Sequence, residues 1–146
     1  MNISQSIDTT AIKEESLRIK NRIDSLIKKN KTFGGISCGT KFSHELIHDS
    51  TDRKIKSILF YYPINNNSDT LQPISHTAIS SYFEEEKVVF INIKYSFVNT
   101  EPNKDFWTIK FEQNIYINDS IQIKELMVGK FDELPIDVKE LINNTL

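Results

Sequence analysis

The sequence predicts an α+β fold in which an N-terminal helix packs on an antiparallel β-meander of about six strands, closed by a short C-terminal helix. Two observations support this expectation. One pattern, an alternating apolar stretch, a polar turn and a second alternating stretch, occurs three times, in Glu45–Tyr62, Ile79–Phe97 and Trp107–Val128. Helical spacing of apolar residues is confined to the two ends of the chain. Short turns between alternating stretches are typical of antiparallel hairpins.

Length and composition indicate a single domain, residues 1–146, with residues 1–9 as a loose tail. The 38% hydrophobic content is enough for a core and too high for a disordered chain. A net charge of −2 without a basic stripe argues against nucleic-acid binding. No apolar run approaches the ~20 residues of a membrane span.

The first predicted element is a helix over Ala11–Asn30, with Thr9 or Thr10 as its N-cap. Its apolar residues recur at helical spacing and form one stripe, Ile12, Ile19, Ile23, Leu26 and Ile27. We expect this stripe to pack on the sheet face that bears Ile91, Ile93 and Tyr95. A helix reserved for a partner or a coiled coil is the alternative.

Gly34, Gly35 and Gly39 predict a turn-rich connection to the strands. Lys54–Tyr62 is expected to be a strand that ends at Pro63 and has Ile55, Ser57, Leu59 and Tyr61 on one face. The segments Ile64–Ser75 and Asn99–Asp105 are polar and contain proline, so we expect mobile loops there.

Two further hairpins follow. The first joins Ser80–Phe83 to Val88–Val98 through Glu84–Lys87, and the second joins Phe106–Ile117 to Ile121–Val128 through Asn118–Ser120. Gly129 ends the last strand, and Pro135 starts the C-terminal helix. The helix is expected to present one apolar side, made of Leu134, Val138, Leu141 and Ile142.

The segment His44-Glu45-Leu46-Ile47-His48 has the letters of a zinc-protease motif. That chemistry needs a helix, so that both histidines bind zinc on one face and Glu45 activates the bound water. Polar residues flank the motif, and the remaining histidine, His76, lies in an Asn/Pro-rich region. We therefore expect Phe42–Asp49 to be extended, with His44 and His48 not sharing a metal. A weak or adventitious metal site is a further alternative.

The other candidates have simpler interpretations. Cys38 is the sole cysteine and is interpreted as an incidental thiol rather than a nucleophile paired with His44 or His76. Glu84-Glu85-Glu86 is interpreted as a solvated hairpin tip. Trp107, together with Phe106, Tyr95 and Phe97, is interpreted as core rather than a ligand cage. Five tyrosines could line a groove or reflect strand propensity alone, Tyr61, Tyr62, Tyr82, Tyr95 and Tyr116.

Several short segments within Ile12–Val128 resemble a group of small, functionally uncharacterised bacterial proteins with a helix and repeated β-hairpins. The resemblance is carried by Lys54-Ile55-Lys56-Ser57-Ile58, by Tyr82–Phe90 and by Ile115-Tyr116-Ile117-Asn118-Asp119. The chain departs from the group at Ser120, where a Gly-Lys pair is more usual. Members are often exported or lipid-anchored. The resemblance implies a strand at His44–His48 and supplies no catalytic residues.

The sequence therefore indicates no catalytic, cofactor-binding or metal-binding residues. It favours a non-enzymatic binding or protein-interaction domain, associated with the bacterial envelope, whose partner and oligomeric state stay open. The alternatives are a small zinc-dependent hydrolase using His44, Glu45 and His48, and a cytoplasmic immunity or antitoxin-type protein. Met1–Thr10 is polar and lacks an apolar leader segment. Localisation is thus expected to be periplasmic or envelope-exposed if a leader was removed, and otherwise cytoplasmic.

Overall fold

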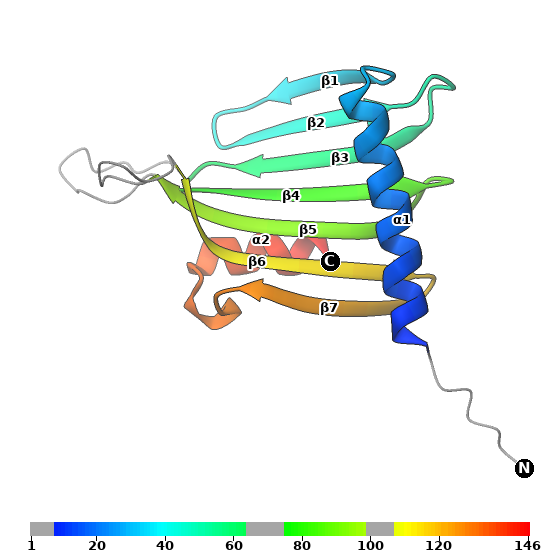
Figure 1. Cartoon of the computed structure of the whole chain (residues 1–146). Helices are drawn as coiled ribbons and strands as arrows, with labels where there is room; N and C mark the ends of the chain where they lie inside the picture. Colours follow the sequence, from blue (N-terminus) through cyan, green and yellow to red (C-terminus); the bar gives the residue numbers. More distant parts are fainter. Residues whose placement is uncertain (1–7, 64–74, 99–106) are drawn as a thin grey trace, which may run out of the picture.

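A computed structural model describes residues 8–63, 75–98 and 107–146. Seven strands form one antiparallel sheet in which each strand pairs with the next along the chain. A long helix crosses one face near the end of the sheet, and a short helix covers the other face (Figure 1). This confirms the predicted α+β meander, with seven strands instead of about six. The elements are α1 Thr9–Lys28, β1 Phe33–Cys38, β2 Phe42–His48, β3 Lys54–Tyr61, β4 Ser75–Glu84, β5 Lys87–Val98, β6 Trp107–Asn118, β7 Ile121–Val128, the 3-10 turn η1 Phe131–Glu133 and α2 Ile136–Thr145.

The additional strand is β1, which the sequence analysis treated as a turn-rich connection. It lies at the edge of the sheet and pairs only with β2, and all six of its residues are exposed. An edge strand without a buried side chain gives no apolar alternation, and its Gly34-Gly35 pair is typical of a turn. The prediction was wrong here because the segment shows no apolar alternation and because its glycine pair indicates a turn.

Helix α1 begins two residues before the predicted start. Its N-cap is Asp8, not Thr9 or Thr10, and a side-chain oxygen of Asp8 accepts a hydrogen bond from the Ala11 backbone N–H at 3.0 Å. An aspartate at this position satisfies one of the free N–H groups of the first turn. The apolar stripe is confirmed, because Ile12, Ile19 and Ile23 are buried.

The stripe of α1 packs on the sheet face opposite to the predicted one. Its partners form one buried cluster with Ile12, Ile19 and Ile23, namely Ile47, Ile55, Tyr82, Phe90 and Tyr116. Strand residues of even and odd number point to opposite faces, so Phe90 lies under α1 while Ile91, Ile93 and Tyr95 cannot. The alternation correctly predicted a buried face, but it did not identify the helix that covers it.

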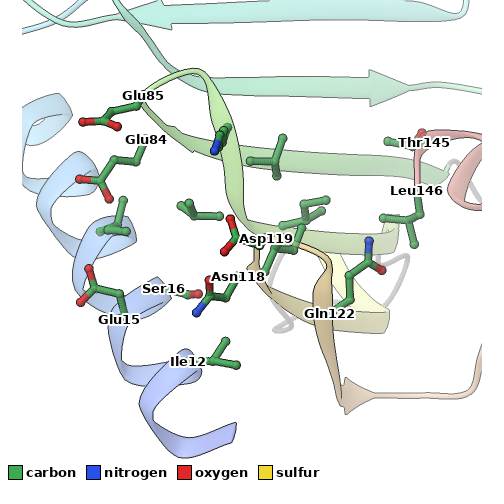
Figure 2. Close-up of a pocket in the computed structure, with 16 residues that line it drawn as sticks. Ile12, Glu15, Ser16, Glu84, Glu85, Asn118, Asp119, Gln122, Thr145 and Leu146 are labelled. Carbon is green, nitrogen blue, oxygen red and sulfur yellow. The ribbon is translucent and has the colours of Figure 1, made fainter. Parts of the chain in front are cut away.

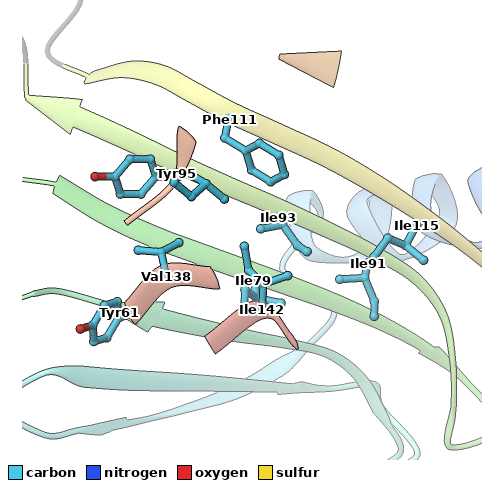
Figure 3. Close-up of a cluster of buried hydrophobic side chains, with 10 residues drawn as sticks. Tyr61, Ile79, Ile91, Ile93, Tyr95, Phe111, Ile115, Val138 and Ile142 are labelled. Atoms are coloured by element: carbon cyan, nitrogen blue, oxygen red, sulfur yellow. The ribbon is translucent and has the colours of Figure 1, made fainter. Parts of the chain in front are cut away.

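The face with Ile91, Ile93 and Tyr95 is covered by α2. Leu134, Val138 and Ile142 recur every four residues and are buried against it, and Pro135 stands at the helix N-cap. Figure 3 shows Val138 and Ile142 among the strand side chains, Ile142 next to Ile79. The sheet residues of this cluster are Tyr61, Ile79, Ile91, Ile93, Tyr95, Phe111 and Ile115. The structure therefore has two apolar layers, one on each face of the sheet.

The alternation predicted for β3 is interrupted at its start. The pairing of β2 with β3 shifts register between Ile47 and His48, opposite Ile55. Ile55 consequently joins the cluster under α1, whereas Tyr61 joins the cluster under α2. A β-bulge re-aims side chains in this way, so the prediction that Ile55 and Tyr61 share a face was wrong.

Most of the two predicted mobile loops lies outside the described residues. These parts are residues 64–74 of the first loop and the whole of the second, residues 99–105. Ser75, predicted to be the last residue of the first loop, is instead the first residue of β4.

Candidate functional site

Two hairpin turns meet α1 at one end of the sheet. Glu84 pairs with Lys87 around Glu85 and Glu86, and Asn118 pairs with Ile121 around Asp119 and Ser120. Glu85 and Glu86 both have left-handed backbone conformations, with φ of 49° and 68°. Two such residues are what a type I′ hairpin turn requires, although Asn-Gly is its preferred sequence.

Between these turns, the first half of α1 and the end of α2 lies a cavity of about 770 Å³, here called the end cleft (Figure 2). Its volume falls in the range of about 300–1,000 Å³ that is typical of ligand sites. The floor comes from α1, β5 and β6 and is mainly apolar, made of Ile12, Ser16, Ile19, Val89, Ile91 and Ile117.

Ser16 is the polar group of this floor. It lies in the buried stripe of α1 and is only 2% exposed. Figure 2 shows its side chain directed from the helix into the end cleft, on the side of Asn118. We find no hydrogen bond to its hydroxyl within the parts of the chain that the structure describes. Among the described residues the fully buried side-chain atoms without a partner are His76 Nδ1 and Thr77 Oγ1, so the Ser16 hydroxyl is not fully enclosed and can bond water or a ligand in the end cleft.

The rim of the end cleft is predominantly acidic. Four carboxylate residues, Glu15, Glu84, Glu85 and Asp119, line it together with one lysine, Lys87. Cations from the outer side of α1 neutralise two of them: Arg18 lies 2.6 Å from Glu15, and Arg22 lies 3.5 Å from Glu84. The hydrogen bond from Arg18 lowers the pKa of Glu15 below its usual value.

Glu85 and Asp119 are the two rim carboxylates without an ion-pair partner among the described residues. Each stands at the tip of a turn in a left-handed conformation, Glu85 with φ of 49° and Asp119 with φ of 52°. The described lining contains no histidine and no cysteine, and no hydrogen bond joins the Ser16 hydroxyl to a rim carboxylate. The arrangement can therefore bind an apolar group and a cation, but it offers no activated nucleophile.

The segment His44–His48, which matches the zinc-protease motif, lies on β2, away from the end cleft. The prediction of an extended segment is confirmed, since Phe42–His48 is a strand paired on both sides. His44 Nε2 lies 2.6 Å from Ser57 Oγ on β3, while His48 pairs with Lys54 beyond the register shift. Among the described residues no group of three or more potential metal-binding side chains comes together. The structure thus places His44 and His48 on a strand, not on the helix that zinc-protease chemistry needs.

Cys38 is not placed to act with either histidine. It is exposed at the end of β1 and pairs with Ser43, so its side chain lies on the sheet face opposite to that of His44. Two strands, β2 and β3, separate it from His76 on β4. The interpretation of Cys38 as an incidental thiol agrees with this placement.

The ligand cage, which was the alternative to the core interpretation of Trp107, does not form within the described part of the chain. Trp107 pairs with Val98 and its ring lies 4.2 Å from that of His76, whereas Tyr95 is buried under α2. Phe106 lies outside the described residues. Burial lowers the pKa of His76, and its Nδ1 has no hydrogen-bond partner among the described groups.

The tyrosines do not line one groove. Tyr61 and Tyr95 belong to the cluster under α2, Tyr82 and Tyr116 to the cluster under α1, and Tyr62 is exposed. Two tyrosine hydroxyls bond to helix carboxylates: Tyr61 donates to Asp137, and Tyr82 donates to Asp24. Their placement therefore supports a structural role.

The sequence analysis missed the end cleft as a site. It identified Glu84-Glu85-Glu86 as a hairpin tip, which is confirmed, but not that Glu84 and Glu85 border a cavity. The cavity depends on side chains from both helices and two hairpins. The pattern within one segment cannot show such a meeting of distant segments; an acidic pair at a turn that favours Asn-Gly was the only local signal.

Comparison of this chain with protein-family models, curated proteins and solved structures finds no match. No helix in the described ranges is both long and apolar enough to cross a membrane.

Proposed function

We propose that this protein is a non-enzymatic binding domain whose ligand occupies the end cleft. The observation that carries the proposal is the open apolar floor beside Ser16, whose hydroxyl makes no hydrogen bond to the described residues. Burying apolar surface of a ligand on such a floor is favourable, and the hydroxyl supplies one directional contact.

The rigid surroundings of the end cleft also support a binding role. Ile12 and Ile19 on α1 are fixed by the buried cluster beneath the helix, and Ile91 belongs to the cluster beneath α2. The floor is thus held from both faces of the sheet. A site held by packed elements does not have to be ordered by its ligand, which lowers the cost of binding.

The test is a titration of protein carrying labelled isoleucine methyl groups with Nile red, a neutral apolar dye. We expect methyl NMR shifts at Ile12, Ile19 and Ile117, which line the end cleft, and none at Ile79 and Ile142 beneath α2. Ser16→Leu should fill the floor and abolish the shifts. Absence of shifts in the parent protein, or shifts confined to Ile79 and Ile142, would exclude the end cleft as the binding site.

A further inference from the structure

We infer that the ligand of the end cleft is a cationic amphipathic segment of another protein, with a large apolar side chain on the floor and lysine or arginine side chains at the rim. The inference rests on the proposed function and adds the chemical class of the partner. Three features of the cleft carry it: the volume and apolar lining of the cavity, the Ser16 hydroxyl that makes no hydrogen bond to the described residues, and the charge of the rim.

The floor selects an apolar side chain. Ile12 and Ile19 line the cavity with Val89 on the α1 side of the sheet, and Ile91 and Ile117 line it on the α2 side, so aliphatic side chains border the space around the end of the sheet. A cavity of about 770 Å³ leaves room for more than one side chain of a partner. An apolar anchor inserted into a pocket is the usual energetic centre of a protein interface.

The Ser16 hydroxyl favours a peptide over a wholly apolar ligand. The group is 2% exposed, points into the cleft and has no hydrogen bond within the described residues. A ligand that brings only carbon atoms would exclude water from this hydroxyl without bonding it, whereas the backbone of a peptide offers both donors and acceptors.

The rim selects positive charge. Arg18 and Arg22 neutralise Glu15 and Glu84, which leaves Glu85 and Asp119 against the single lysine of the lining, Lys87. The two unpaired carboxylates stand on the two turns that flank the mouth. A cationic side chain at either turn gains attraction from the carboxylate there, while an anionic ligand is repelled.

Glu85 and Glu86 occupy a turn that their own conformational preferences disfavour. Both residues have positive φ, which asparagine and glycine adopt at lower cost. Strained positions of this kind are often associated with functional sites. This observation is consistent with a use for the Glu85 side chain, and it provides a variant that removes the charge without endangering the fold.

The experiment is calorimetric titration with two synthetic peptides of equal length, one of alternating leucine and lysine and one of alternating leucine and glutamate. We expect the leucine-lysine peptide to bind, and to bind more weakly as the salt concentration is raised. In a parallel NMR titration it should shift the methyl signals of Ile12, Ile19 and Ile117. The leucine-glutamate peptide should not bind. Equal binding of both peptides would overturn the inference.

Two matched double variants distinguish the effect of the rim carboxylates on peptide affinity from the effect of the protein's net charge. Glu85→Gln with Asp119→Asn should weaken binding of the leucine-lysine peptide about fivefold to tenfold, since exposed ion pairs are individually weak. The control is Asp132→Asn with Glu133→Gln, which removes the same charge from η1; its affinity should change less than about twofold. Equal losses in the two double variants would contradict a role for the rim.

A third variant guards against loss of the fold. Glu85→Asn with Glu86→Gly should raise the melting temperature and still weaken binding of the leucine-lysine peptide.

If Nile red binds in the end cleft but the peptides show no charge preference, only the class of partner is wrong. If neither Nile red nor a peptide binds, the proposed function fails as well. Methyl shifts on simple dilution of the protein would assign the cleft to a second copy of this chain and overturn the inference.

Discussion

The phenolic hydroxyl of Tyr82 on β4 donates a hydrogen bond to Oδ1 of Asp24 on α1 at 2.7 Å, joining the helix to the sheet beside the buried cluster. The other oxygen of Asp24 accepts from Lys20 at 2.7 Å. Burial alone would raise the pKa of Asp24, but the hydrogen bonds from Lys20 and Tyr82 outweigh it and lower that pKa. Tyr61 donates to Asp137 of α2 at 2.6 Å on the opposite face. A tyrosine–aspartate pair therefore links each helix to its own face of the sheet.

The Tyr82–Asp24 bond should contribute measurably to stability. Tyr82→Phe keeps the buried ring but removes the donor, so we expect the free energy of unfolding to fall by about 1 kcal/mol in urea titrations. Tyr62→Phe is the control, because Tyr62 is 42% exposed and its hydroxyl has no hydrogen bond among the described residues. Equal unfolding midpoints for the two variants would show that the bond does not hold α1 in place.

The stripe of α1 should be essential to the fold, whereas the apolar residues of β1 should not. Ile23 is 0% exposed and Ile36 is 70% exposed. Ile23→Ala leaves a cavity between α1 and the sheet and should cost about 2–5 kcal/mol. Ile36→Ala should change stability by less than about 0.5 kcal/mol. Chemical denaturation of both variants checks this, and an Ile23→Ala protein as stable as its parent would show that α1 is not docked.

Gly129 should tolerate no side chain. Its φ is +76°, and a Cβ added there would lie 2.0 Å from the backbone oxygen of Lys110. Gly129→Ala should therefore destabilise the protein by about 2 kcal/mol or more, through both backbone strain and displacement of β6. In Gly35→Ala the new methyl group meets nothing within 4 Å, so this variant should melt close to the parent. A Gly129→Ala protein with an unchanged melting temperature would contradict the geometry at the end of β7.

The sequence was sufficient for the hairpins and the apolar stripes but not for their assembly. Alternation through Ile91, Ile93 and Tyr95 correctly predicted a buried face, because a strand has only two faces to choose from. The choice between α1 and α2 as its cover depends on how the chain crosses the sheet, which no local pattern records. β1 was missed because an exposed edge strand containing Gly34-Gly35 lacks a buried side. The end cleft was missed because Ser16, Glu85 and Asp119 are far apart in sequence.

Ionisation of Tyr61 should destabilise the fold at alkaline pH. Burial, with the hydrogen bond to Asp137, raises the pKa of Tyr61 from 10.0 to about 12. A raised pKa means that the folded state favours the neutral phenol; this contribution is complete below pH 10 and is lost as the pH rises through about 12. Tyr61→Phe should be less stable than the parent below this window and approach or exceed it above, where the parent would hold tyrosinate beside the Asp137 carboxylate. Urea titrations across the window test this, and a constant difference between the two proteins would contradict it.

The histidines of β2 should not hold a stoichiometric metal ion together. Positions i and i+4 of a strand lie about 13 Å apart at ~3.3 Å per residue, whereas zinc–nitrogen bonds are only ~2.0–2.1 Å long. His44 also lies 2.6 Å from Ser57 Oγ, which orients its ring along the sheet. We expect purified, untagged protein and a His44→Ala, His48→Ala variant to have the same low zinc content. Stoichiometric zinc that disappears in this variant, together with a peptidase activity lost in Glu45→Gln, would contradict the proposed binding function and favour a zinc hydrolase. Such a result requires β2 to bend and bring both imidazole rings to one ion.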